Sequence, residues 1–131
     1  MEFDEENVHV LVGPNGVGKT NILEAISLLS LTKSCQKADE IDIITWGSEF
    51  YRVKAQVQSD TSEEKSLELV SQIAPRKQKA CFINDVKVPI NQMVGSLPSV
   101  IFLPQDLEIF TGAPARRRGF LDQLLCQVSP E

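Results

Sequence analysis

The sequence has little of the residue types on which most metal and disulfide sites depend. It contains one histidine and three cysteines in 131 residues. His9 has no second imidazole to act with, which excludes a histidine-based metal or catalytic site. Cys35, Cys81 and Cys126 are odd in number and far apart, so their spacing fits neither metal ligation nor a disulfide framework. We expect three free thiols, buried or half-buried, in a reducing compartment.

Long hydrophobic runs and excess positive charge are also absent. No apolar stretch approaches the roughly 20 residues of a membrane span, and no signal peptide opens the sequence. The net charge of −5 and the pI of about 4.9 argue against a chain that coats nucleic acid nonspecifically. Positive charge is concentrated at residues 76–79 and 116–118. A DNA-binding surface, if the chain has one, must therefore be local.

What the sequence does contain is a complete G-x-x-x-x-G-K-[ST] phosphate loop, followed by a predicted helix over Lys19–Leu31 and preceded by a predicted strand over Val8–Val12. Glycines let successive backbone N–H groups converge on phosphates at a helix N-terminus. The Lys19 ammonium reaches the terminal phosphates, and the Thr20 hydroxyl is a ligand for Mg²⁺. We therefore predict that a nucleoside triphosphate and Mg²⁺ bind at Gly13, Pro14, Asn15, Gly16, Val17, Gly18, Lys19 and Thr20.

The pattern after this loop predicts an α/β fold in which an antiparallel β-meander decorates a phosphate-loop core. The helix over Lys19–Leu31 is apolar nearly all round, so we expect it to be buried on most sides. Period-two alternation then predicts antiparallel strands, with Asn84-Asp85 as a two-residue turn. The remaining predictions are strands at Ile41–Trp46, 50–58, 66–73, 79–83, 86–88 and Ser99–Leu103, a helical turn within 91–97, and a helix from Pro114.

Two separated motifs carry a resemblance to a known family. The first is the phosphate loop with the start of its helix, Gly13–Ile26. The second comprises Val100–Glu108, Gly112–Pro114 and Arg116–Asp122. In this order they resemble the RecF family of bacterial DNA replication and repair ATPases, which is related to the SMC and ABC-type ATPases. Lys33-Ser34 and the Trp46-Gly47 pair occupy positions where that family has similar elements, so the likeness runs through nearly the whole chain.

The resemblance implies a phosphate-loop lobe of the ABC/SMC type and a division into three parts. These are a phosphate-loop core (1–49), an antiparallel β lobe (50–90), and a core strand with its following helix (91–131). It also implies a cytoplasmic protein, apart from the membrane, that dimerises around two ATPs. Such a protein binds single- and double-stranded DNA at gaps or junctions, helps RecO and RecR load RecA, and supports the SOS response.

Gln105 is a second, weaker candidate ligand for Mg²⁺. ABC-type ATPases place a glutamine after a core strand, where it touches the metal and the attacking water. The alternative is a loop residue that caps the next helical turn together with Asp106. The cations Arg116 and Arg117 are likewise open to two interpretations, an internal pairing with Asp106 or Glu108 and a contact with DNA phosphate.

Some elements of the family pattern are missing. No run of four apolar residues ends in Asp-Glu, so a Walker B acid is absent, and no Ser-x-Gly-Gln-type signature occurs. The family also has a strand upstream of the position of Met1 and continues past that of Glu131, so the resemblance implies a lobe that is incomplete at both ends. Two other functions stay open. One is a different phosphate-loop enzyme such as a nucleotide kinase, and the other is a non-hydrolysing interaction domain.

Overall fold

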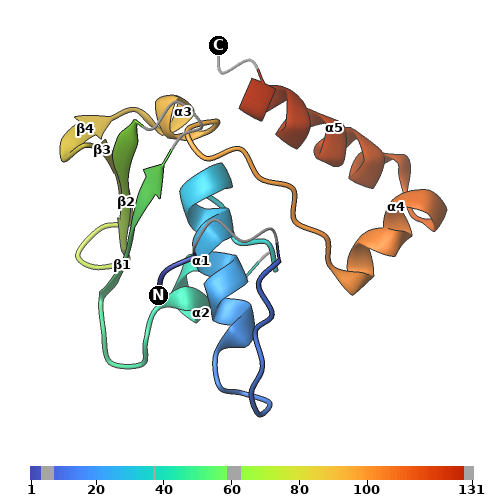
Figure 1. The fold of residues 1–131 in the computed structure, drawn as a ribbon, viewed down its shortest axis with the longest axis horizontal. Coiled ribbons are helices and arrows are strands. Elements are labelled where there is room, and N and C mark those ends of the chain that lie inside the picture. The colour runs from blue at the N-terminus through green and yellow to red at the C-terminus, as the bar shows by residue number, and fades with distance from the viewer. Residues whose placement is uncertain (4–7, 37, 59–62, 129–131) are drawn as a thin grey trace.

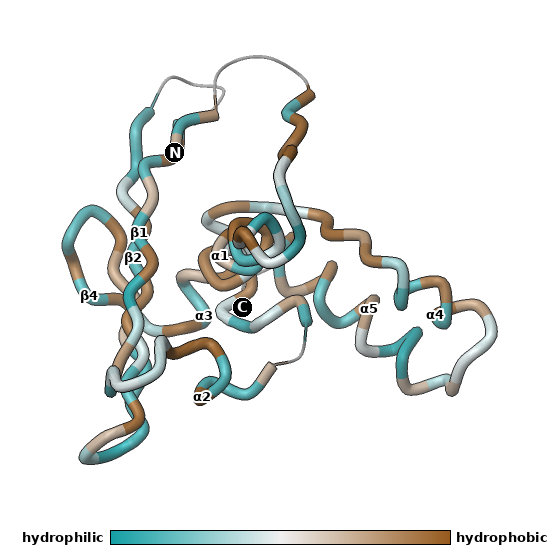
Figure 2. Tube along the Cα trace, turned by 90° about the horizontal axis from the view of Figure 1, so that it is seen from below, coloured by the Kyte–Doolittle hydropathy of each residue, from teal (hydrophilic) through white to brown (hydrophobic). Residues whose placement is uncertain are grey.

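A computed structural model describes residues 1–3, 8–36, 38–58 and 63–128 (Figure 1). An antiparallel four-stranded sheet, in the order β1-β2-β3-β4, forms one layer. The first helix, α1, lies between this sheet and the arm formed by α4 and α5 (Figure 2). The elements are α1 (Lys19–Leu31), α2 (Glu40–Ile43), β1 (Phe50–Gln58), β2 (Glu64–Gln72), β3 (Gln78–Ile83), β4 (Val86–Val88), α3 (Ile90–Met93), η1 (Pro104–Leu107), α4 (Glu108–Thr111) and α5 (Pro114–Val128).

The core lies between α1 and one face of the sheet. Val53 pairs with Leu69, Leu69 with Cys81, and Cys81 with Val88, so one apolar row crosses all four strands. Alternate residues of a strand point to the same face, which explains why the period-two pattern predicted these strands correctly. The buried cluster on this face consists of Leu29, Leu67, Leu69, Cys81 and Met93.

The opposite face of the sheet carries charge. Lys54 and Glu68 are directly opposed on β1 and β2, with 3.5 Å between Nζ and Oε2.

In the turn between β3 and β4, Asn84 and Asp85 both have positive φ, 51° and 63°. Two successive residues with φ above zero are typical of the type I′ turn that suits a two-residue hairpin. The predicted turn between β3 and β4 is therefore confirmed.

Burial of α1 differs from the prediction. Its bounds are as predicted, but only the C-terminal half is enclosed, where Ser27, Leu28, Leu29 and Ser30 are buried. In the N-terminal half, Leu23 remains 40% exposed. Apolar composition all round predicted burial on most sides. Among the described residues, however, the sheet covers one side of the helix at its C-terminal half.

Two predicted core strands are not strands in this structure. Residues 8–12 and 99–103 are extended but join no ladder within the described part of the chain. Val10, Val100 and Phe102 are 70% exposed or more. A strand needs a neighbour to bond its backbone N–H and C=O groups. The apolar runs were recognised correctly, but a partner strand is not among the residues described.

The segment predicted as a strand at Ile41–Trp46 begins instead as a short helix. Asp39 precedes α2 in an extended conformation, and Glu40 and Asp42 lie in its first turn. Acidic residues at this end favour a helix because they interact with the positive end of its dipole. The prediction weighed the apolar residues and missed this signal. Trp46 is fully exposed in the loop that follows.

The last helix, α5, begins at Pro114, as predicted. None of its residues is buried, and Leu121 and Leu125 are 55% and 64% exposed.

All three cysteines are free, as predicted. Cys81 is buried and Cys35 is half-buried, whereas Cys126 is exposed on α5, contrary to the prediction.

Candidate nucleotide-binding site

The phosphate loop connects the extended segment 8–12 to the first turn of α1. Gly16 and Gly18 have φ of 82° and 98°, a region that side chains with a Cβ avoid. At Gly13 a Cβ would lie 3.0 Å from Cγ1 of the exposed Val17 side chain, which would have to shift. The loop backbone thus favours glycine at positions 16 and 18 by its conformation.

The N-terminus of α1 is left open for an anion. Gly18 caps the helix without a side chain, and the first turn contains no acidic residue. The first N–H groups of a helix have no partner within it. Together with the helix dipole they make a positive end that attracts phosphate.

Lys19 lies over the loop. Its Nζ donates hydrogen bonds to the carbonyl oxygens of Gly13, at 2.8 Å, and Pro14, at 2.7 Å. The cation is therefore held by two neutral oxygens that a phosphate group outcompetes on charge. The structure brings the predicted residues of the loop together as one continuous turn, with Thr20 exposed beside it in the first turn of α1.

The second metal candidate lies elsewhere in the chain. Gln105 is exposed in η1, and its side chain makes no hydrogen bond to any described residue. Asp106 is the capping residue there, since its Oδ2 accepts the backbone N–H of Leu103 at 2.8 Å. Capping by Asp106 matches half of the alternative interpretation. No hydrogen bond joins Gln105 to the phosphate loop within the described ranges, and its metal role remains a prediction.

The arginines at the start of α5 are paired internally. Arg116 forms an ion pair with Glu108. Arg117 donates to the carbonyl oxygens of Ile109 and Gly112, both at 3.3 Å. Arg118, in contrast, has no partner among the residues that the structure describes. Two of the three cations therefore hold α4 and α5 together.

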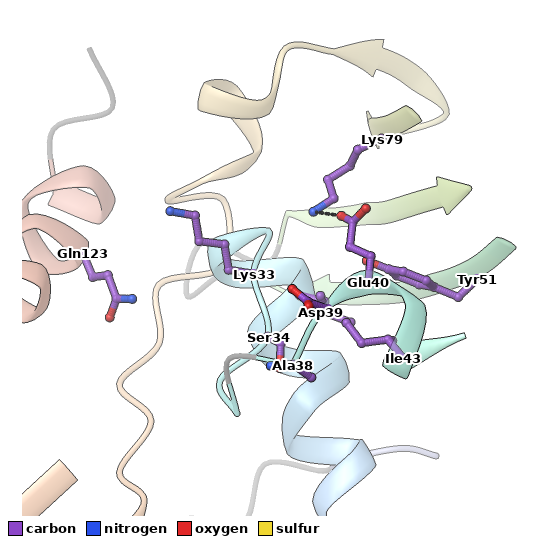
Figure 3. A pocket seen from close by; sticks show the side chains of 10 residues that line it. Lys33, Ser34, Ala38, Asp39, Glu40, Ile43, Tyr51, Lys79 and Gln123 are labelled. Carbon is purple, nitrogen blue, oxygen red and sulfur yellow. Dashed lines mark hydrogen bonds and ion pairs between the residues drawn. The ribbon is translucent and has the colours of Figure 1, made fainter. Parts of the chain in front are cut away.

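A cavity of about 320 Å³ opens near the C-terminal end of α1 (Figure 3). On its wall, Nζ of Lys79 lies 2.5 Å from Oε1 of Glu40 and donates to the carbonyl oxygen of Thr32. Burial alone would raise the pKa of Glu40, but the hydrogen bond and charge of Lys79 outweigh it and lower that pKa. Lys79 is half-buried in β3, within the strand predicted over residues 79–83.

The loop after α1 is organised by polar residues of that helix, which sequence reasoning did not single out as functional. Ser27 donates to the carbonyl oxygen of Lys33 at 2.8 Å, and Ser34 donates to Glu24. The Ser34 hydroxyl also accepts the backbone N–H groups of Gln36 and Ala38. These contacts fix the loop after α1. The polar positions of an otherwise apolar helix were the signal that could have revealed it.

The fold and the loop together define a structural class, a phosphate-loop lobe whose fold is similar to that of the SMC type. A solved structure from a study of ATP-driven dimerisation and DNA-stimulated activation of SMC ATPases superposes with a TM-score of 0.68 over 93% of this chain and 86% of that one. At 18% identity this likeness concerns the fold alone. The family described as "AAA domain, putative AbiEii toxin, Type IV TA system" matches residues 8–71.

Within this class the chain resembles RecF. The DNA replication and repair protein RecF of Bacillus cereus (strain G9842) is 36% identical over 126 residues, which cover 96% of this chain and 33% of that protein. RecF of Bacillus anthracis (strain CDC 684 / NRRL 3495) is 35% identical over the same length. The resemblance to the RecF family, predicted from two motifs, is confirmed.

Solved RecF structures agree with this assignment. The recombination mediator protein RecF with ATPrS, and RecF with ATP, each superpose with a TM-score of 0.81 and 31% identity over 89% of this chain. These matches cover 31% and 32% of the RecF chains. The chain thus spans about one third of the length of its relatives. None of the helices in the described ranges is long and apolar enough to cross a membrane.

Proposed function

We propose that this chain binds Mg²⁺-ATP at residues Gly13 to Thr20. The observation that carries the proposal is the position of Lys19, whose ammonium group is held over the loop by two carbonyl oxygens beside the open N-terminus of α1. These residues fit a triphosphate: backbone N–H groups cradle its oxygens, Lys19 supplies positive charge, and Thr20 offers a hydroxyl for the metal. RecF structures solved with ATP and ATPrS support the assignment.

Calorimetric titration tests this proposal. We expect one ATP to bind per chain, and we expect AMP to bind much more weakly because the loop recognises the β- and γ-phosphates. Removing Mg²⁺ with a chelator should weaken ATP binding, since the metal offsets the phosphate charge and would link the phosphates to the Thr20 hydroxyl. Equal affinity for ATP and AMP would contradict a phosphate-loop site.

The 131-residue chain should bind ATP without turning it over. Phosphoryl transfer requires a positioned water and groups that stabilise the developing charge, as well as a phosphate cradle. The sequence contains neither an apolar run ending in Asp-Glu nor a Ser-x-Gly-Gln-type signature. Phosphate release that exceeds the rate of a Lys19→Ala control would contradict this expectation.

The wider role that we infer is that of a RecF-like protein in DNA replication and recombinational repair. In a protein of the relatives' full length, we propose ATP-dependent homodimers in the cytoplasm that bind single- and double-stranded DNA at gaps. Such a protein acts with RecO and RecR to load RecA and contributes to the SOS response. The support is the identity to proteins named for DNA replication and repair. It is reinforced by the superposition on a recombination mediator of the RecFOR pathway.

The paired arginines bear on where DNA would bind. Replacing Arg116 and Arg117 by Ala should lower the melting temperature of this chain by a few degrees, because exposed ion pairs contribute up to about 1 kcal/mol. In a full-length protein, the same change should leave the salt dependence of DNA affinity unaltered. Arg118→Ala is the matched control and should not reduce the melting temperature. A salt slope smaller by about one per arginine would instead identify a phosphate contact.

A further inference from the structure

The side chain of Gln127, in the last turn of α5, makes a two-point contact with the backbone of Ser99. Its Oε1 accepts the backbone N–H of Ser99 at 2.8 Å, and its Nε2 donates to the carbonyl oxygen of Ser99 at 3.2 Å. The same Oε1 accepts the hydroxyl of Ser30 at 3.3 Å. The hydroxyls of Ser99 and Ser30 are themselves 2.7 Å apart. One carboxamide therefore joins α5, the extended segment 99–103 and α1.

This contact reproduces what a neighbouring strand would offer. A carboxamide carries one acceptor and one N–H donor in the arrangement of a peptide group, and an extended residue presents the complementary pair. Segment 99–103 has no strand partner within the described residues. Gln127 satisfies both backbone groups of Ser99, the first residue of that segment. Ser30, which shares the network, is fully buried and keeps its bond to the Ser99 hydroxyl when Gln127 is replaced. The groups that lose their partners are therefore the backbone N–H and C=O of Ser99.

The end of α5 is also fitted closely to the rest of the molecule. Gly95 has φ of 90°, and a Cβ placed on it would lie 3.0 Å from the carbonyl oxygen of Gln127. Earlier in α5, Leu121 and Leu125 remain exposed. In Figures 1 and 2, α4 and the start of α5 extend away from the sheet. The last turn of α5 is thus where this helix meets Ser30 of α1, Ser99 and Gly95.

We infer that Gln127 is a positioning residue that holds segment 99–103 and the end of α5 against the C-terminal half of α1. Segment 99–103 leads directly into η1, which carries Gln105, and α5 begins with the arginine cluster 116–118. The contact therefore ties both to the helix that begins at the phosphate loop. This role of Gln127 does not depend on the proposed ATP binding.

Hydrogen exchange at the Ser99 amide tests the inference. Gln127→Met keeps the length and helix preference of the side chain but removes both hydrogen bonds. Gln123→Met is the matched control, because Gln123 lies one turn earlier on α5, is exposed at the cavity of Figure 3, and makes no side-chain hydrogen bond to a described residue. We expect the Ser99 amide to exchange at least tenfold faster in Q127M and within about twofold of the parent in Q123M, with the amides of β2 and β3 unchanged in both. Equal Ser99 rates in the two variants, or acceleration that spreads equally to β2 and β3, would overturn the inference.

Two further measurements separate the possible failures. Gln127→Glu keeps the acceptor for the Ser99 N–H and loses the donor, so the Ser99 rate should fall between those of the parent and Q127M; a rate equal to that of Q127M would contradict the two-point contact. Mg²⁺-ATP should slow exchange in the phosphate loop of the parent, Q127M and Q123M alike, because Gln127 contacts the end of α1 opposite the loop. Absence of protection at the loop counts against ATP binding, whereas the Ser99 rates measured without nucleotide decide the role of Gln127.

Discussion

Replacing Lys19 by Ala should reduce the affinity of the chain for Mg²⁺-ATP by roughly 10- to 100-fold, equivalent to about 1.5–3 kcal/mol for hydrogen bonds to a charged group. Lys19 is the only cationic side chain of the loop. Its ammonium must leave the carbonyl oxygens of Gly13 and Pro14, or share them, when a phosphate binds. The exchange favours phosphate because a charged acceptor binds an ammonium group more strongly than a neutral one.

Residual binding is expected in this variant. The glycine turns and the open N-terminus of α1 do not depend on the lysine side chain, so the backbone N–H groups remain available. Lys33→Ala is the matched control, because it removes the same charge from an exposed lysine beyond the other end of α1. Calorimetric titration of both variants should separate a local contact from a change in net charge. If K33A lost as much affinity as K19A, the site would not be at the loop.

The elements whose hydrogen bonds are local or between strands adjacent in sequence were predictable. The helix bounds of α1 follow from the motif and its apolar run, and its capping glycine is part of the motif. The β-meander follows from alternation, and the turn at Asn84-Asp85 follows from residues that tolerate positive φ. In each case the backbone groups that hydrogen-bond to one another lie within the same helix or in consecutive strands.

The elements that depend on distant partners were not predictable from pattern alone. Val8–Val12 and Ser99–Leu103 are apolar enough for core strands, but such a pattern says nothing about which strand lies beside them. The contact between Gln127 and Ser99 spans 28 residues and has no sequence signature. At the candidate site the sequence identified the loop motif, and the structure arranges its residues in one turn; their binding role remains a prediction. The carbonyl partners of Lys19 and the Ser34 network required the structure.

The largest effect on stability is expected for Leu29→Ala. Leu29 is 3% exposed and is the residue through which α1 joins the cluster of Leu67 and Leu69 on the sheet. Truncating a buried leucine removes transferred apolar surface and leaves a cavity, which typically costs about 2–5 kcal/mol. Leu23→Ala is the matched control, since Leu23 lies on the same helix and is 40% exposed. Chemical denaturation should show a large loss for L29A and a much smaller one for L23A.

The same pair of variants tests whether the sheet supports the nucleotide site. A ligand that binds only the folded state stabilises it by RT ln(1 + [L]/Kd), whatever the starting stability. If the sheet merely keeps α1 folded, saturating Mg²⁺-ATP should raise the unfolding free energy of L29A and L23A by equal amounts. If packing at Leu29 also sets the position of the phosphate loop, the gain should be smaller in L29A, because its Kd is then weaker. We expect equal gains, since the loop lies at the exposed end of α1 and Leu29 in its buried half. A gain in L29A less than half that in L23A would contradict this expectation and would place the loop under the control of the sheet.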